Sequence, residues 1–380
     1  MTRKNYRNSL LLILITLAVL AGFVGCTEGP VGIFASIAQE KDINANRTAA
    51  FDGTSPDFVG ILDTNYYTII NGTIWTRPVA GGKWIEVAPP TGIAQGEASS
   101  AAIAGTHLYV VFGKIGDSNQ KVWAKETSTA WDDTLATFIP PVRIDSLLSA
   151  NDQLFAITRA DTGSPIVTEY TLHYLNGTAF TAIPVAGISG RPSSVAHDGT
   201  DYWITAGEAI YRGAEASFAV GVNDLPSDTF AGVTVDGITV IFSSTSGKLY
   251  TYNSGGAWPV SSVFEKSDLP HAFSAPAIVT AGVASYLLVG TVSGNDAATA
   301  SGYLEFDIPL AGFDPTTASA SEGSDFADIV NFLTSVSINY ITSFSVADEG
   351  AGKRVFALTV GNGLWSNYFN GTTWSGWARE

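Results

Sequence analysis

The stretch Tyr66-Tyr67-Thr68-Ile69-Ile70-Asn71-Gly72-Thr73-Ile74-Trp75 holds the pattern that decides the fold of this chain. Tyr66–Ile70 consists of aromatic and β-branched residues, which are typical of a strand packed on both faces. Asn71-Gly72 follows at once, and this dipeptide tolerates the positive φ angles that a tight hairpin requires. A second β-prone run then begins near Ile74-Trp75. The stretch therefore predicts two antiparallel strands joined by a short turn.

The same unit recurs along the chain. In each copy a strand of small and apolar residues precedes a polar turn, a strongly β-prone strand, a third strand with an aromatic residue and a closing hairpin. The β-prone second strands are Tyr66–Ile70, Leu108–Phe112, Leu154–Thr158, Tyr202–Thr205, Ile238–Phe242, Tyr286–Gly290 and Val355–Thr359. From Trp75 to Trp365 the chain advances 290 residues over six intervals, roughly 48 per unit, which is near the period of kelch and WD40 repeats.

Seven such units, each too small to bury its own faces, predict an all-β fold. We expect a seven-bladed β-propeller of four-stranded antiparallel blades over residues 51–380, with a pair of long β-sandwiches as the alternative. The first strand of each blade should line the central channel and carry small residues, because only small side chains fit there. The alternative is that their hydroxyl groups line a funnel that holds a small ligand or water. These small residues are Ser99, Ser100, Ser146, Ser193, Ser194, Ala231, Ser274 and Ser343.

The N-terminus has the three-part layout of a secretory signal. Arg3, Lys4 and Arg7 form a positive head, and Leu10–Gly25 is an almost unbroken apolar run that ends at Cys26, the only cysteine in the chain. We expect residues 1–25 to be a lipoprotein signal peptide and residues 26–50 to be the lipidated Cys26 followed by a tether. The alternatives are an ordinary cleavable signal with an incidental cysteine, or a plain membrane anchor.

The charge balance argues against nucleic acid as a partner and against membrane binding through clustered basic residues. Removal of residues 1–25 takes away three basic residues and no acid, so 19 basic residues become 16 against 35 acidic ones, a net charge of −19. Nucleic-acid binding needs a basic face, and a polybasic grip on anionic lipid needs clustered Lys and Arg. With one cysteine there is no internal disulfide, so stability must come from the burial of a core.

The chain resembles the β-propeller lipoproteins of spirochaetes, treponemal ones in particular. The resemblance rests on Phe23-Val24-Gly25-Cys26, which fits the looser spirochaetal lipobox, on Gly32–Ile37 and Gln39-Glu40, and on the seven units. It implies a lipid-anchored protein of the cell envelope and says little about mechanism. Thr27 directly after the cysteine favours the outer membrane by the enterobacterial sorting rule.

No residue set predicts catalysis. Asn370–Trp374 looks similar to the Asp-box hairpin of sialidase-type propellers but lacks its full Ser and Asp spacing, and that hairpin is a structural element of the blade rim. Asp117-Ser118-Asn119 and His197–Asp201 place oxygen ligands in turns, yet a calcium loop needs more ligands at fixed alternation. We therefore expect no metal and no cofactor other than the lipid on Cys26.

Loops on a rigid scaffold commonly carry binding residues. The candidate loop contacts are Asp117, Asn119, Asp198, Asp201 and Asp348. Most tryptophans should pack between blades, while exposed ones on the rim, such as Trp131, Trp374 and Trp377, would anchor a partner or a sugar.

Three hypotheses for function follow. The first is a membrane-anchored envelope lipoprotein whose propeller is a platform for a protein partner. The second is a carbohydrate-binding or glycan-processing propeller, and the third is a structural envelope protein or surface antigen without a specific ligand. A propeller fold alone does not choose among them. Whether a small molecule binds stays open at this point.

Overall fold

The computed structural model describes residues 48–113, 120–138, 142–162, 167–184, 188, 190–220, 228–253, 263–265, 271–293, 302–309, 312–314, 320–322 and 340–380. The chain divides into two compact units, residues 1–45 and residues 46–380, and the description below concerns the second. The predicted signal peptide, Cys26 and most of the tether lie outside the described residues. Among the helices of the described part, none has the length and apolar character needed to cross a membrane.

Seven antiparallel sheets follow one another along the chain, preceded by one turn of 3-10 helix, η1 (Ala49–Phe51). Blade 1 contains β1 (Pro56–Leu62), β2 (Asn65–Ile70), β3 (Thr73–Pro78) and β4 (Ile85–Glu86). Blade 2 contains β5 (Ala98–Ala104), β6 (His107–Phe112) and β7 (Lys121–Lys125). Blade 3 contains β8 (Ile144–Ala150), β9 (Gln153–Thr162), β10 (Val167–Asn176) and β11 (Ala179–Ala182). Blade 4 contains β12 (Pro192–His197), β13 (Tyr202–Ala206), β14 (Ala209–Ala214) and β15 (Ser217–Val220). Blade 5 contains β16 (Phe230–Asp236), β17 (Thr239–Ser244), β18 (Lys248–Asn253) and β19 (Val263–Glu265). Blade 6 contains β20 (His271–Ala281), β21 (Ala284–Ser293), β22 (Tyr303–Asp307) and β23 (Ala320–Glu322). Blade 7 contains β24 (Ile341–Asp348), β25 (Lys353–Thr359), β26 (Leu364–Phe369) and β27 (Ala378–Arg379).

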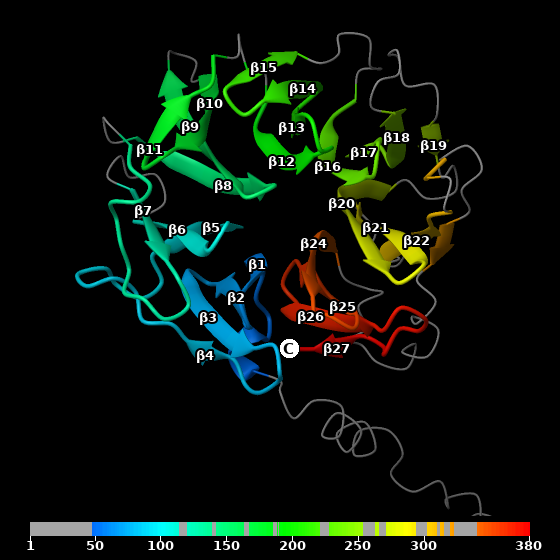
Figure 1. The fold of residues 1–380 in the computed structure, drawn as a ribbon, viewed down its shortest axis with the longest axis horizontal. Coiled ribbons are helices and arrows are strands. Elements are labelled where there is room, and N and C mark those ends of the chain that lie inside the picture. Colours follow the sequence, from blue (N-terminus) through cyan, green and yellow to red (C-terminus); the bar gives the residue numbers. More distant parts are fainter. Residues whose placement is uncertain are drawn as a thin grey trace, which may run out of the picture. The chain divides into compact units, whose positions relative to one another are not determined.

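The sheets are arranged as a ring, and the prediction of a seven-bladed β-propeller is confirmed. Figure 1 looks down the ring, with the first strand of every blade nearest the middle and the later strands farther out. Asn71 and Gly72, the hairpin of the opening motif, have φ angles of 51° and 73°, as that turn requires. Blade 2 differs from the others, because in the described residues it contains three strands instead of four.

A β-bulge interrupts the first strand of every blade near its start. In blades 1 to 5 and 7 one residue is skipped in the pairing with the second strand, and in blade 6 two are skipped. The skipped residues are Asp57, Ser99, Asp145, Ser193, Ala231, Ser274 with Ala275, and Thr342. Because a bulge bends its strand and increases its twist, the same bend is applied seven times around the channel.

Serine hydroxyls link neighbouring first strands. Ser100 Oγ accepts from Leu147 N at 2.9 Å, so β5 is joined to β8. Ser194 Oγ bonds both the N–H and the carbonyl of Val233, at 3.3 and 3.2 Å, which joins β12 to β16. Ser100 and Ser194 thus join neighbouring blades, whereas Ser99 and Ser193 bond within their own blades, to Val111 and Thr205.

Seven hydrophobic clusters fill the seven interfaces between blades, each drawing residues from two adjacent sheets. The second strands dominate them: β6 is buried at five of its six residues and β13 at all five. Full burial of a Val, Leu, Ile or Phe side chain contributes about 1.5–3 kcal/mol. Since each sheet is covered on both faces, its strands lack the apolar–polar alternation of a half-exposed sheet.

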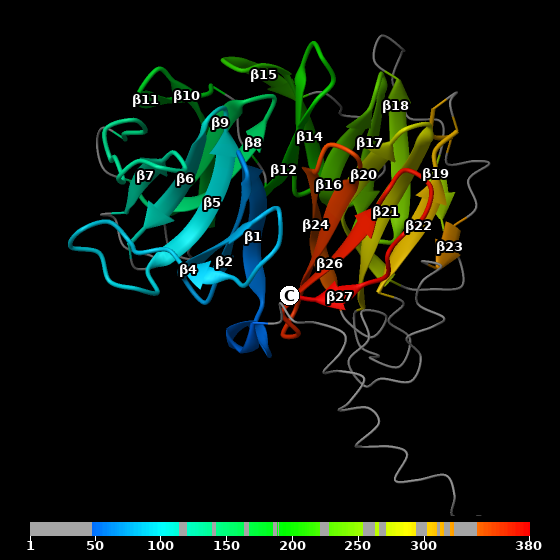
Figure 2. The ribbon, with the colours of Figure 1, turned by 60° about the horizontal axis from the view of Figure 1, so that its bottom comes forward.

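The first and last blades are not consecutive in the chain, so non-covalent contacts close the ring, among them a backbone hydrogen bond from Gly363 N to the Thr54 carbonyl at 2.8 Å. Figure 2 shows β1 and β24 side by side at this junction. Here Arg77 Nη1 donates to Glu380 Oε2, which also accepts from Trp84 Nε1 at 3.0 Å, and Ser366 Oγ donates to Glu380 Oε1. The Arg77 guanidinium carbon lies 5.2 Å from the ring centres of both Tyr66 and Trp84. We call Arg77, Trp84, Ser366 and Glu380 the closure cluster.

Breaking the closure cluster should destabilise the whole ring. Arg77 and Glu380 are 5% and 3% exposed, and removal of one member of a buried ion pair typically costs about 3–5 kcal/mol, because the other charge stays buried. We expect Arg77→Met to lower the free energy of unfolding by about that amount in urea titrations. Arg191→Met is the control, because Arg191 pairs with Asp145 with 58% of its side chain exposed, and such pairs contribute about 0–1 kcal/mol. Equal losses in the two variants would contradict this account of ring closure.

Candidate functional site

The predicted loop contacts of blade 4 are engaged in internal bonds. Asp198 Oδ1 accepts from the N–H groups of Thr200 and Asp201 at 2.9 and 2.8 Å, and Oδ2 accepts from Trp203 Nε1 at 2.9 Å. Asp201 Oδ2 accepts from Arg212 Nε at 2.7 Å. The aspartates therefore hold the turn between β12 and β13, and as partner contacts they stay predictions.

Asp348 has a similar place in the turn between β24 and β25. Its Oδ1 accepts from Gly350 N at 2.8 Å, and Lys353 pairs with its other oxygen. The Lys353 hydrogen bond and the Gly350 N–H hold the pKa of Asp348 below its ordinary value. Because Asp348 is in blade 7, the structure does not bring it together with the aspartates of blade 4. Asp117 and Asn119 lie outside the described residues.

Two of the three rim tryptophans, Trp374 and Trp377, do not form an exposed anchor. Trp377 is 5% exposed and donates from Nε1 to Tyr303 Oη at 3.1 Å, so the expectation that it is exposed was wrong. Trp374 is half-buried between blades 6 and 7, with its ring 4.8 Å from Phe369 and 5.8 Å from Tyr286. Both side chains pack in the interface between blades 6 and 7, as the sequence predicted for most of the tryptophans.

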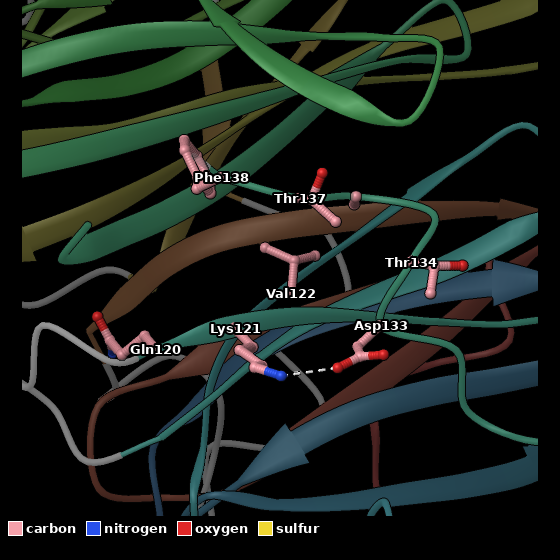
Figure 3. A pocket seen from close by; sticks show the side chains of 8 residues that line it. Gln120, Lys121, Val122, Asp133, Thr134, Thr137 and Phe138 are labelled. Atoms are coloured by element: carbon pink, nitrogen blue, oxygen red, sulfur yellow. Dashed lines mark hydrogen bonds and ion pairs between the residues drawn. The ribbon is translucent and has the colours of Figure 1, made fainter. Parts of the chain in front are cut away.

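A groove on the rim between blades 2 and 3 is the feature that sequence reasoning missed. One wall is the start of β7 with the residue before it, and the other is the segment that leaves blade 2. The cavity has a volume of about 530 Å³ and is lined by Gln120, Lys121, Val122, Asp133, Thr134, Ala136, Thr137 and Phe138 (Figure 3). We call it the rim groove.

The rim groove exists because the chain turns away from β7 after one bridge. Ala124 and Asp132 exchange both backbone hydrogen bonds, at 2.8 and 2.9 Å. Asp132 Oδ1 then accepts from both the N–H and the hydroxyl of Thr134 at 2.7 Å, which closes a tight turn. These bonds, with the Thr134 hydroxyl first, hold the pKa of Asp132 below its ordinary value.

The segment that follows Asp132 ends on blade 3. Thr137 donates from its N–H and its hydroxyl to the Thr178 carbonyl, at 3.0 and 2.9 Å, and its own carbonyl accepts from Phe180 N at 2.9 Å. The Phe138 ring stacks on that of Phe180, with 4.4 Å between centres. The segment that would have continued as a fourth strand of blade 2 is therefore fixed to the outer strand of blade 3.

The walls of the rim groove combine apolar and polar groups. Val122 and Ala136 are each 2% exposed and form the apolar part with Phe138. Lys121 Nζ and Asp133 Oδ2 join the two walls at 2.8 Å, as Figure 3 shows. The Lys121 side chain is 64% exposed, so this pair contributes little to stability, and it is easily opened.

Two further cavities lie near blade 2. One, of about 520 Å³, is on the side of β7 that faces blade 1 and is lined by Trp123, Lys125, Trp131 and the Val87–Thr91 segment. Trp123 Nε1 is buried there without a hydrogen-bond partner. The other, of about 490 Å³, includes Asp57, whose pKa is raised by burial. In the part of the chain that the structure describes, no group of three or more His, Cys, Asp or Glu residues is placed to hold a metal ion.

Comparison with known proteins supports the fold. No family model matches the chain, and no curated protein matches it. Among solved structures, YCF48 bound to D1 peptide is similar with a TM-score of 0.56 at 10% identity, over 85% of this chain and 94% of that one. A chain of the mitotic checkpoint complex gives a TM-score of 0.54 at 8% identity, over 87% and 94%. YCF48 from Cyanidioschyzon merolae gives 0.51 at 10%, over 82% and 95%. At these identities the likeness shows the fold alone.

The wall of the rim groove should make the protein sensitive to mild acid. His173 lies behind the Phe138 ring, 5.1 Å between centres, and burial lowers its pKa from 6.5 to about 4. Between these values the unfolded chain binds a proton that the folded chain does not, so stability is complete above pH 6.5 and falls as the pH drops toward 4. We expect urea unfolding at several pH values to show a shallower fall in this window for His173→Gln. An unchanged slope would contradict this role of His173.

Proposed function

We propose that this chain is an exported envelope protein, anchored by a lipid on Cys26, whose propeller binds a protein partner in the rim groove. The observation that carries the proposal is the rim groove beside β7, a cavity of about 530 Å³ whose walls combine apolar and polar groups. Ligand sites in proteins are typically concave and mostly apolar, with a few polar groups that fix orientation. The Lys121–Asp133 pair supplies such groups, while the buried Gln120 accepts from Ile144 N through its Oε1 at 2.9 Å.

Two kinds of observation support the protein partner. The propeller presents a rigid ring, and surface segments on a rigid frame are suited to binding. Among the structural neighbours, YCF48 is bound to D1 peptide, and another neighbour is a chain of the mitotic checkpoint complex, an assembly of proteins. The fold of this chain is therefore compatible with a platform role, and the rim groove is the site that we propose for it.

The anchoring proposal rests on the N-terminal sequence. The lipobox-like Phe23–Cys26, the resemblance to spirochaetal lipoproteins and the acidic mature chain all favour an envelope location, with the outer membrane favoured by Thr27. Attachment through more than one acyl chain gives stable membrane binding, since each buried CH₂ contributes about 0.8 kcal/mol. The tether would then place the propeller close to the membrane surface.

One observation favours carbohydrate binding as a second candidate. In the cavity facing blade 1, Trp131 and Trp123 line the same space, and the buried Trp123 Nε1 has no partner. Aromatic faces with a nearby donor suit a sugar ring. A glycan array probed with the protein and with Trp131→Ala would test this candidate, and binding lost in the variant would favour it.

A photo-crosslinker in the rim groove should capture the partner. Thr134 is exposed and lines the groove, so we place a benzoylphenylalanine there in cells that make the lipidated protein. The control position is Ala216, an exposed hairpin residue between β14 and β15 in a blade whose fourth strand is paired. We expect one recurrent adduct from position 134 and none of that mass from position 216. The same adducts from both positions, or none from position 134, would overturn the proposed site.

Loss of Cys26 should release the protein from membranes. The thiol is the proposed attachment point, so Cys26→Ala removes the acyl chains and most of the membrane affinity. We expect the protein to shift from the membrane fraction to the soluble fraction, and its mass to lose the lipid. Thr27→Ala, which keeps the thiol, is the control. An unchanged mass and distribution in Cys26→Ala would exclude lipidation.

A further inference from the structure

Two arginines share one aspartate at an end of blade 3. Arg159 donates to Asp161 through Nε at 3.1 Å and Nη2 at 3.3 Å, and Arg143 donates to the same carboxylate through Nη1 at 2.9 Å. Hydrogen bonds from Arg159 and then from Thr168 hold the pKa of Asp161 below its ordinary value, so this carboxylate is charged at neutral pH. One negative charge is therefore set against two positive ones.

A third arginine joins the group from the neighbouring blade. Arg191 directly precedes β12 of blade 4, and its Nε donates to Asp145 of β8 at 2.5 Å. The hydrogen bond to Asp161 chiefly, and the charge of Asp145 to a smaller extent, raise the pKa of Arg159, so the two ion pairs are neighbours. We call Arg143, Arg159 and Arg191 the arginine cluster. Its three guanidinium groups and the two carboxylates that they contact leave a formal charge of +1.

The length of β9 explains how the cluster forms. β9 continues from Arg159 to Thr162 beyond its pairing with β8, and β10 pairs with it along this extension. Arg159 and Asp161 face blade 4, because alternate residues of a strand share a side and Ile157 packs on that side. The Arg159 N–H donates to the Arg143 carbonyl at 3.0 Å, so Arg143 lies at the base of the extension. Two blades that are neighbours in Figure 1 thus supply the cluster.

The arginine cluster is open to solvent. The side chains of Arg143, Arg159 and Arg191 are 29%, 31% and 58% exposed. In the part of the chain that the structure describes, the Arg143 side chain donates only through Nη1 and the Arg191 side chain only through Nε. A guanidinium group has further N–H donors on its other nitrogens, which a ligand can use without breaking these pairs.

The rim groove reaches the base of the same extension. Gln120, which lines the groove, accepts from Ile144 N at 2.9 Å, and Ile144 directly follows Arg143 in the chain. Lys121, the next residue of the groove wall, has 64% of its side chain exposed and is paired with Asp133. A segment that leaves the groove at this end therefore passes close to Arg143.

We infer that the partner segment bound in the rim groove is acidic beside its groove-bound part, and that one of its carboxylates pairs with the arginine cluster. This rests on the proposed function, because it names the chemistry of the partner at that site. The planar guanidinium fork matches the two oxygens of a carboxylate, and a bidentate pair also fixes the direction of approach. Acidic groups elsewhere on the chain oppose the segment only weakly, since charges more than about 8 Å away are largely screened at physiological salt.

NMR of the arginine side chains tests this inference before a partner is identified. The purified full chain carries isotope-labelled arginine, and the Nε–H signals are assigned from Arg→Lys variants. The probe is the peptide Ser-Glu-Tyr-Glu-Ser, blocked at both ends, and the control probe has Gln in place of each Glu. Arg212 is the internal control, because its side chain is 32% exposed and its one carboxylate partner is Asp201.

We expect the Glu probe to shift the signals of Arg143, Arg159 and Arg191 in a saturable way and to leave Arg212 unchanged. The Gln probe should shift none of them. Equal shifts at Arg212, equal shifts with both probes, or no shift at the cluster would overturn the inference. Inorganic phosphate is titrated separately, and shifts with phosphate but not with the Glu probe would assign the cluster to a phosphate group and reject an acidic peptide.

Two substitutions should change the affinity for the Glu probe in opposite directions. Arg159→Gln removes one guanidinium group and should weaken binding by about tenfold. Asp161→Asn removes the carboxylate that competes for Arg143 and Arg159, so it should tighten binding by about as much. If these residues only brace the extension of β9, both variants bind more weakly, and that result would overturn the inference. An unchanged Arg212 signal checks that each variant is folded.

The result is separable from the test of the proposed function. An adduct at position 134 in cells, with no shift at the arginine cluster, would keep the partner site and reject an acidic segment. Shifts at the cluster without a cellular adduct would support carboxylate binding by the cluster and reject the rim groove as the partner site in the cell.

Discussion

Ring closure between blades 7 and 1 is the constraint on which the rest of the molecule depends. Every blade takes its strands from one continuous stretch of chain, so no β-strand pairing ties the two ends together. The junction depends instead on packing and on the buried Arg77–Glu380 pair, whose carboxylate oxygens also accept from Trp84 and Ser366. A buried charge is tolerable only when it is paired and its remaining hydrogen-bonding capacity is used, and this site meets that condition on the carboxylate side.

A closed ring tolerates irregularity at its rim. The interfaces are filled by the inner strands, while outer strands such as β4 and β11 are largely exposed. Blade 2 can therefore lack a regular fourth strand and still contribute Val111 and Val122 to its interface with blade 3. The rim is the place where a change in the path of the chain costs the least buried surface, and the rim groove lies there.

The sequence predicted the repeated core well and the groove poorly, for physical reasons. The β-prone second strands and turns such as Asn71-Gly72 encode their structure locally, and seven repeats reinforce the pattern. The groove depends on where the chain goes after Ala124, which is decided by one aspartate turn at Asp132 and by the pairing of Thr137 with blade 3. A turn acid looks the same in sequence whether it caps a turn, as Asp198 does, or contacts a partner.

The candidate sites differ in how far their polar groups are already used in hydrogen bonds within the protein. In the turns of blades 4 and 7, Asp198 and Asp348 already accept backbone hydrogen bonds, so a partner would have to compete with bonds that hold the fold. Along the channel, hydroxyls such as that of Ser194 are used between blades. At the rim groove the Lys121–Asp133 pair has its lysine side chain 64% exposed and contributes little to stability, so a partner that opens it disturbs the fold less. Binding gains most where the polar groups that it uses do not also hold the fold, because no internal bond is then lost. That argument favours the rim groove over the acidic turns.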